Sequence, residues 1–247
     1  MLPIPLPTGL KGYVSTVGEK RGGDAFGAFN LADHVGDESE NVLLNRRRLQ
    51  KQLNCPDIQW LRQVHGVRCV EVAGVEETAI EADAAFTVEA NVALAVLTAD
   101  CLPIVIWGER ELAVCHAGWR GLVDGVVTNT VARFSNPIGA WIGPAISATN
   151  YEVGQEVWHR FDDGMWRDHL HAHREDGAKR LLDLPAMAAQ QLRELGVSEV
   201  ELSGLCTYED QRFYSHRRHS HMSGQGECGR FATLVWRQET GATGSVS

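Results

Sequence analysis

Apolar runs separated by short polar turns dominate the chain, and three of them follow one another closely near its middle. Residues 92–97, 103–107 and 112–116 are nearly all apolar, which is typical of strands buried on both faces. The polar residues 108–111 between the last two runs are typical of a hairpin turn. We therefore expect three adjacent strands in this part of the chain.

Helical spacing, with apolar residues three or four positions apart, predicts four helices. They are residues 38–53, a pattern from Gly121 to Phe134, residues 151–161 and residues 183–195. Asp37 or Ser39 is the expected N-cap of the first helix, and Gly196 ends the last. The arginines at 46–48 are expected on a solvated face of the first helix, with ligand binding as the less favoured alternative.

Residues 58–72 alternate as in a strand and are broken at Gly66, so that His65 stands at a strand end. Further candidate strands are residues 140–146, 197–205 and 231–236.

No repeat and no low-complexity linker divides the chain, so residues 1–247 are predicted to form a single domain. Its fold class is α+β, with a central mixed sheet or sandwich flanked by helices. Gly22 and Gly23 lie in a polar loop, for which an active-site flap is the alternative interpretation. The small polar residues at 240–247 are expected to form a frayed tail.

The composition is that of a globular protein, with 44% apolar and 22% charged residues. A formal charge of −9 argues against nucleic-acid or anionic-membrane partners, which favour a basic face. No apolar run reaches the roughly 18 residues that span a bilayer, and the proline-rich start lacks the charged region of a signal peptide. Six scattered cysteines without a CxxC are expected to be reduced thiols, which favours a cytoplasmic location.

Cys101 and His116 stand at the ends of predicted strands, and His65 stands at a strand break. Two imidazoles and a thiolate with an open fourth position are what a catalytic zinc requires, although the spacing fits no standard motif. Cys115 competes with His116, but neighbours on a strand face opposite sides, so we expect Cys115 to point into the core.

The same residues allow chemistry without a metal. Cys101 could be a nucleophile activated by His65 or His116, with Asp100 orienting an imidazole. Copurification of a metal would separate the two hypotheses.

Several other chemistries find little support. The chain has no GxxxxGK[ST] and no GxGxxG, so neither a P-loop nor a dinucleotide site is indicated. His169, His171 and His173 would share one face of an extended backbone, but a solvated loop is favoured over a metal site there. A conventional multicopper oxidase needs several His-x-His pairs, and those of this chain lie in polar, loop-like sequence.

Short motifs along nearly the whole chain resemble those of the YfiH/YlmD family, whose members are labelled multicopper polyphenol oxidases or laccase-domain proteins and are also described as purine nucleoside enzymes. The two most specific motifs are TADCLP at 98–103 and HAGWRG at 116–121. Others are FNL at 29–31, QVHG at 63–66, IGP at 142–144, YEVG at 151–154, CT at 206–207 and GR at 229–230.

The resemblance implies a single domain with a zinc held by His65, Cys101 and His116, and copper is the alternative metal. It implies phosphorolysis of adenosine, inosine, guanosine and methylthioadenosine, together with deamination of adenosine. The partners are then nucleosides and phosphate, with no obligate protein partner. Candidate phosphate-binding cations are Arg62, Arg120, Arg217, Arg218 and Arg230.

Two further activities are suggested within the family, a peptidoglycan-editing amidase acting on UDP-MurNAc-amino acid and a copper-dependent phenol oxidase. A non-catalytic metal-binding protein is the remaining alternative. The chain departs from the family pattern at Ser147, His216 and Cys228. These departures do not affect the proposed metal ligands, but they leave the substrate preference open.

Overall fold

The computed structural model describes residues 1–18, 25–162, 164–173, 176–224 and 227–238. The Gly22-Gly23 loop, for which an active-site flap is the alternative interpretation, and the 240–247 tail, which is expected to be frayed, lie outside the described residues.

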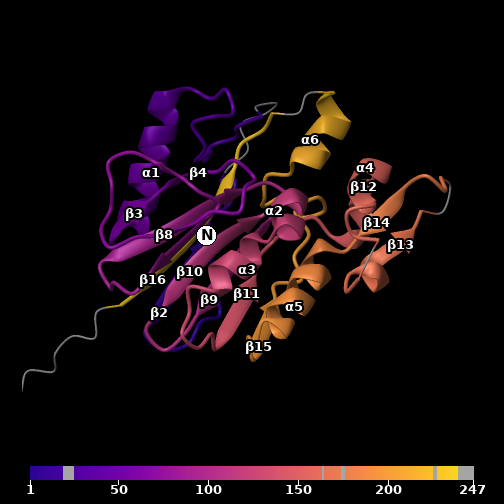
Figure 1. Ribbon diagram of the computed structural model, residues 1–247. Coiled ribbons are helices and arrows are strands. Elements are labelled where there is room, and N and C mark those ends of the chain that lie inside the picture. Colours follow the sequence, from indigo (N-terminus) through magenta and orange to yellow (C-terminus); the bar gives the residue numbers. More distant parts are fainter. Residues whose placement is uncertain (19–24, 163, 174–175, 225–226, 239–247) are drawn as a thin grey trace, which may run out of the picture.

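Two mixed sheets form the centre of the fold (Figure 1). The five-stranded sheet has the order β1 (Leu2–Pro3), β2 (Leu10–Val14), β16 (Phe231–Arg237), β8 (Val92–Thr98), β3 (Asp57–Gln59). The six-stranded sheet has the order β15 (Glu199–Leu202), β11 (Gly139–Ile142), β9 (Leu102–Trp107), β10 (Leu112–Ala117), β7 (Ala84–Thr87), β5 (Cys69–Glu71). The α+β class is therefore confirmed, with the sandwich as its core.

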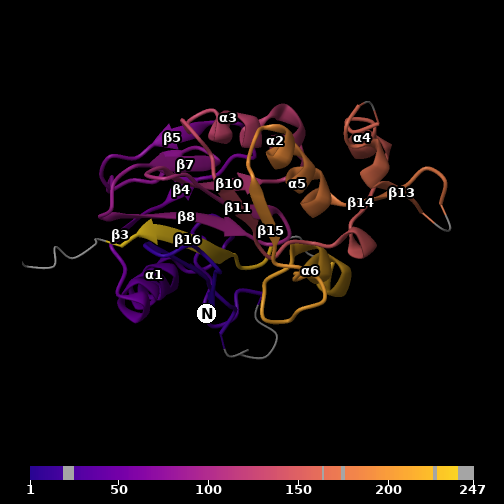
Figure 2. The ribbon, with the colours of Figure 1, turned by 90° about the horizontal axis from the view of Figure 1, so that it is seen from below.

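Helices cover both outer faces of the sandwich, and Figure 2 shows the resulting layers. Helix α1 (Ser39–Leu53) lies on the five-stranded sheet, while α2 (Trp119–Asp124), α3 (Val126–Val131) and α5 (Leu184–Glu194) lie on the six-stranded sheet. Apolar clusters fill the spaces between these layers, because strands buried on both faces must have a partner on each.

Smaller elements complete the fold. They are the sheet of β12 (Glu152–Val153), β14 (Arg180–Leu182) and β13 (Leu170–Ala172), the pair β4 (Leu61–Arg62) and β6 (Ile80–Glu81), the helices α4 (Gln155–Trp158) and α6 (His216–Ser223), and the 3-10 turns Ala148–Asn150 and Arg167–His169. Within the described residues no helix is both long and apolar enough to cross a membrane.

Three expectations about individual elements are corrected. The strands at 92–97 and 103–107 are not neighbours, because β8 belongs to one sheet and β9 to the other. The helix expected from Gly121 to Phe134 is interrupted at Gly125, whose φ of 103° requires glycine, so two short helices replace one. The helix expected at 151–161 begins only at Gln155, because Glu152–Val153 pairs with β14.

Helix α1 also departs from the sequence interpretation. Its N-cap is Glu38, without a side-chain cap, because the Asp37 carboxylate accepts from the Asn30 side chain instead. Arg47 and Arg48 are exposed as expected, but the Arg46 side chain is only 16% exposed and is directed towards the loop before the helix.

Candidate metal centre

A strand register brings Cys101 and His116 together. Strands β9 and β10 form the expected hairpin, in which His116 pairs with Pro103 and Ala117 with Leu102. Cys101 immediately precedes β9, so it lies beside the end of β10, although 15 residues separate it from His116. Cys115, the other candidate, is fully buried in the cluster beneath the helices, as the alternation of the strand predicts.

The turn before Cys101 carries the chain from one sheet to the other. β8 ends at Thr98 and β9 begins at Leu102, so three residues make the crossing. Asp100 adopts a φ of 94° there, a conformation that costs energy for a non-glycine residue. Its carboxylate is held by the Thr207 hydroxyl, at 2.6 Å, and by the backbone N–H of Arg217, at 2.7 Å.

Asp83, which the sequence interpretation missed, organises the histidines. Its buried carboxylate accepts a hydrogen bond from Nδ1 of His116 at 2.8 Å. It also accepts from the backbone N–H groups of Val64, His65 and Gly66, at 3.2, 2.9 and 2.7 Å. One carboxylate therefore fixes the His116 ring and the loop that carries His65, a partnership common around metal-binding histidines.

The loop from β4 to β5 presents His65 in a left-handed backbone conformation, with a φ of 58°. Such strain persists only where surrounding contacts enforce it, and here three successive N–H groups bind Asp83. The expected strand break at Gly66 is thus an anchored turn that turns His65 towards Cys101.

The ligand atoms of His65, Cys101 and His116 all lie within 4.8 Å of one another. The Cys101 Sγ is 3.9 Å from His65 Nε2, and the two imidazole rings meet edge to face with centres 4.8 Å apart. Bonds of about 2.0–2.3 Å to a tetrahedral zinc would place such donors about 3.3–3.8 Å apart, so a modest contraction suffices. Because Asp83 occupies Nδ1 of His116, its Nε2 is the nitrogen available to a metal.

Gly118 makes the close approach of the donors possible. A Cβ at this position would lie 2.9 Å from Cδ2 of His65 and 3.1 Å from Sγ of Cys101. Any larger residue would press on both donors, so glycine in the HAGWRG motif has a packing reason.

The site also shifts the protonation of its own donors. Burial acts to raise the pKa of the Cys101 thiol, but contacts with His116 and His65 outweigh it and lower the pKa to about 6. Burial opposes the charging of His116, yet Asp83 and Cys101 raise its pKa to about 9. Both shifts favour a thiolate beside an imidazolium in the absence of metal, and a metal cation would replace the proton on His116.

A cavity of about 450 Å³ opens over the three donors. Its walls combine apolar or aromatic side chains, among them Leu97, Trp119, Ile146 and Tyr151, with cationic ones. Burial raises the pKa of the Tyr151 phenol, which keeps it a neutral hydrogen-bond donor. A few polar groups in an otherwise apolar hollow are typical of a small-molecule site.

Three of the five candidate arginines line this cavity, namely Arg120, Arg217 and Arg230. The other two lie elsewhere. Arg62 is exposed and forms an ion pair with Glu81 at 2.5 Å, and the Arg218 guanidinium donates to backbone carbonyls, including that of Tyr208 at 2.8 Å. The structure thus brings together His65, Cys101 and His116 with three of the five cations.

The structure also tests the role suggested for Asp100. Asp100 does not orient an imidazole, because Thr207 and the Arg217 backbone occupy its carboxylate, and Asp83 holds His116 instead. A signal for Asp83 exists in the sequence, since a lone carboxylate in the apolar stretch ADAAF at 82–86 needs a buried partner.

The fold and the site define a class of protein, an α+β sandwich with an open site of two histidines and one cysteine. Residues 15–238 match the family described as multi-copper polyphenol oxidoreductase laccase. A Xylella fastidiosa protein named purine nucleoside phosphorylase is 39% identical over 231 residues, covering 84% of this chain and 83% of the relative. The Shigella flexneri protein named purine nucleoside phosphorylase YfiH is 36% identical over 242 residues, covering 94% and 96%.

A crystal structure of a Neisseria meningitidis protein is similar over 96% of this chain and 98% of its own, with 35% identity and a TM-score of 0.86. The chain therefore belongs to the laccase-like family that includes YfiH, which confirms the resemblance seen in its motifs.

Proposed function

We propose that the protein is a metal-dependent purine nucleoside phosphorylase that also deaminates adenosine. The observation that carries the proposal is the co-location of three metal donors and three guanidinium groups in one cavity. The names of its curated relatives, purine nucleoside phosphorylase, support the phosphorylase part of the proposal. The substrates are adenosine, inosine, guanosine and methylthioadenosine, with phosphate as the second reactant.

His65, Cys101 and His116 would hold the metal, for which we propose zinc. Two imidazoles and one thiolate match the borderline preference of zinc, and the described residues supply no fourth donor to close the site. Bound there, zinc would supply Lewis-acid chemistry to a substrate or water oxygen. Asp83 keeps His116 in the required tautomer, so that its Nε2 faces the donors.

Cationic side chains give the cavity its affinity for phosphate. Arg120, Arg217 and Arg230 line it and would neutralise a dianion that attacks the ribose. Arg217 is fixed by donating to the Glu152 carbonyl at 2.9 Å and lies over the Tyr151 ring, 5.4 Å from its centre. Trp119 and Tyr151 offer flat surfaces against which a purine can stack.

The oxidase label of the family fits the described residues less well. A multicopper cluster requires many histidine ligands, whereas the chain, over the residues the structure describes, brings only one group of three donors together. His169, His171 and His173 do not form a second group.

The test is to incubate the metal-loaded protein with inosine or adenosine, with and without phosphate, and to separate the products by chromatography. We expect phosphate-dependent release of free base and phosphate-independent conversion of adenosine to inosine. Cys101→Ala and His116→Ala should abolish both, while Cys55→Ala and His171→Ala, which change the same residue types outside the cavity, should retain both.

Absence of both reactions in the wild-type protein would contradict the proposal. Cleavage of a UDP-MurNAc-amino acid would then be the next assay, because that alternative uses the same donors.

A further inference from the structure

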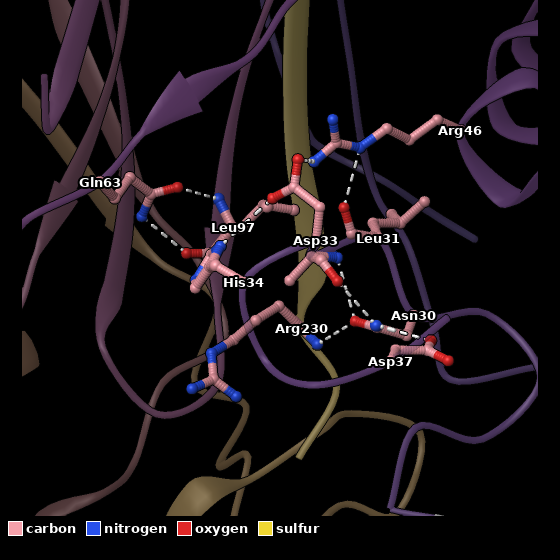
Figure 3. Close-up of polar contacts among 10 residues, drawn as sticks. Asn30, Leu31, Asp33, His34, Asp37, Arg46, Gln63, Leu97 and Arg230 are labelled. Carbon is pink, nitrogen blue, oxygen red and sulfur yellow. Dashed lines mark hydrogen bonds and ion pairs between the residues drawn. The ribbon is translucent and has the colours of Figure 1, made fainter. Parts of the chain in front are cut away.

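A histidine outside the three-donor group, His34, lies at the rim of the cavity, on the loop between β2 and α1. We call residues 30–37 the rim loop. His34 of this loop lines the cavity that contains the three donors, and Figure 3 shows its polar surroundings. The sequence interpretation assigned His34 no role.

Buried hydrogen bonds hold the rim loop in place. The buried Asn30 carboxamide donates to the Ala32 carbonyl and to the Asp37 carboxylate, both at 2.9 Å. Its oxygen accepts from the backbone N–H of Ala32 at 3.0 Å and of Arg230 at 2.9 Å (Figure 3). A fully satisfied buried amide makes this a rigid platform and ties the loop to Arg230, the residue before β16, which lines the cavity.

Arg46 of α1 connects the platform to His34. Its Nε donates to the Leu31 carbonyl at 2.9 Å, and its guanidinium lies 3.4 Å from the Asp33 carboxylate. The other oxygen of that carboxylate lies 3.4 Å from Nδ1 of His34. Hydrogen bonding to His34 and the charge of Arg46 lower the pKa of Asp33 to about 2, so the carboxylate is ionised at neutral pH.

His34 therefore has the arrangement of an oriented acid–base imidazole. The Asp33 carboxylate lies 3.4 Å from Nδ1 and can accept from Nδ1–H, which orients the ring and leaves Nε2 to act on a substrate. Among the described residues no partner occupies the other nitrogen, Nε2, on a side chain that is 53% exposed at the cavity. No hydrogen bond that builds the rim loop uses the His34 side chain, so the loop fold does not require it.

A comparison with His216 shows why the carboxylate matters. His216 lines the same cavity, but partial burial and the nearby Arg230 lower its pKa, which favours the neutral ring. Of the two cavity histidines outside the three-donor group, only His34 has its ring nitrogen in contact with a carboxylate among the described residues.

We propose that His34 is the general acid of phosphorolysis, with Asp33 and Arg46 as its positioning residues. A phosphate oxygen forms the bond to C1′ of the ribose while the bond from C1′ to N9 breaks, and its electron pair passes into the purine ring. The Nε2–H of His34 donates its proton to a ring nitrogen of the leaving purine. The proton that the attacking hydrogen phosphate releases, carried by water, then reprotonates His34. This assignment rests on the proposed function.

The experiment measures how the rate depends on the leaving base. His34→Gln keeps a polar side chain but removes the acid, so we expect kcat for inosine to fall by about 10²-fold with KM little changed. The base of 7-methylguanosine leaves as a neutral molecule without protonation, so kcat for this substrate should fall less than about threefold. Across inosine, guanosine, adenosine and 7-methylguanosine, the variant should show a steeper dependence of rate on leaving-base acidity.

Asp33→Asn should show the same selectivity for leaving base with a smaller loss, of about tenfold, because the imidazole remains but is no longer oriented by a carboxylate. Asp33→Glu should restore part of the rate, which a purely structural role would not predict. His171→Gln, an exposed histidine on β13, is the control and should match the wild type.

Two failures are distinguishable. If the wild type cleaves no nucleoside, the proposed function is wrong. If the wild type is active and His34→Gln lowers all substrates equally, or none, His34 is not the acid and the inference is overturned. Metal content measured in each variant, expected to be unchanged, separates an effect on the three donors from an effect on protonation.

Discussion

Two regions of this protein are rich in metal-binding residue types, and only one forms a site. His65, Cys101 and His116 come from three distant parts of the chain and meet within 4.8 Å. His169, His171 and His173 are close neighbours in sequence and do not meet. We call these the converging site and the histidine-rich segment.

The histidine-rich segment fails because its backbone is not uniformly extended. His169 lies in a 3-10 turn and contacts Gln190 at 2.8 Å, whereas His171 lies in β13. His173, beyond the strand, pairs with Glu152 at 2.7 Å. In the converging site, the register of β9 with β10 and one buried carboxylate direct all three donors to one point. Convergence depends on topology more than on the local density of histidines.

The largest test removes donors from each region in turn. His65→Ala, Cys101→Ala or His116→Ala should each abolish stoichiometric zinc binding and lower kcat/KM by about 10³-fold, since a bound metal contributes several kcal/mol to catalysis. Replacing His169, His171 and His173 together by Ala should leave both unchanged. Zinc content by elemental analysis and the phosphorolysis assay check this. Retention of metal by the single variants would show that the converging site is not the metal site.

A second test uses the thiols of the metal-free protein. With a pKa of about 6, Cys101 is mostly thiolate at pH 7, whereas burial raises the pKa of Cys55 and Cys69 to about 11. Allowing for the weaker nucleophilicity of a low-pKa thiolate, iodoacetamide should modify Cys101 about 50-fold faster than either.

The sign of the pH dependence is fixed by the lowered pKa. The Cys101 thiolate is present above about pH 6 and is lost as pH falls through that value. The rate at which iodoacetamide modifies Cys101 should therefore be flat from pH 7 to 8 and decline below pH 6. Peptide mapping by mass spectrometry measures it, and zinc should protect Cys101 alone. A tenfold rise per pH unit between 6 and 8 would show an ordinary thiol.

Much of the converging site was predictable, because the sequence predicts the hairpin. Once 107 pairs with 112, Cys101 falls beside the end of β10, so its contact with His116 follows from register. The position of His65 does not follow, because it depends on three backbone N–H groups gathering around Asp83. The side chain that gathers them is 18 residues away from His65 in sequence.

The fold shows a similar division between local and long-range information. Apolar periodicity located α5 and β16 to within one residue of their bounds. It could not show that β8 and β9 belong to different sheets, because runs buried on both faces read alike in either sheet. It also missed the break at Gly125, since helical spacing continues across it.

A third test compares the two carboxylates that hold an imidazole. Asp83→Asn should lower zinc affinity by about 10–100-fold, because the amide cannot accept from Nδ1–H of His116 and all the loop N–H groups at once. Glu152→Gln removes the partner of His173 and should leave zinc affinity unchanged. Competition with a chromophoric chelator measures the zinc affinity of each variant. Equal zinc affinities in the two variants would show that Asp83 does not position His116 for the metal.

The smallest test adds one methyl group to each region. Gly118→Ala places a Cβ 2.9 Å from His65 and 3.1 Å from Cys101, so the donors must move apart, and we expect roughly tenfold weaker zinc binding and about 1–3 kcal/mol of lost stability. Gly177→Ala lies shortly after the histidine-rich segment, where a Cβ meets no atom within 4 Å, and should change neither. Chelator competition and thermal unfolding of both forms measure the effect. Unchanged zinc affinity in Gly118→Ala would show that the donors have room to spare, and that Gly118 is present for the backbone turn into α2 and not for their close approach.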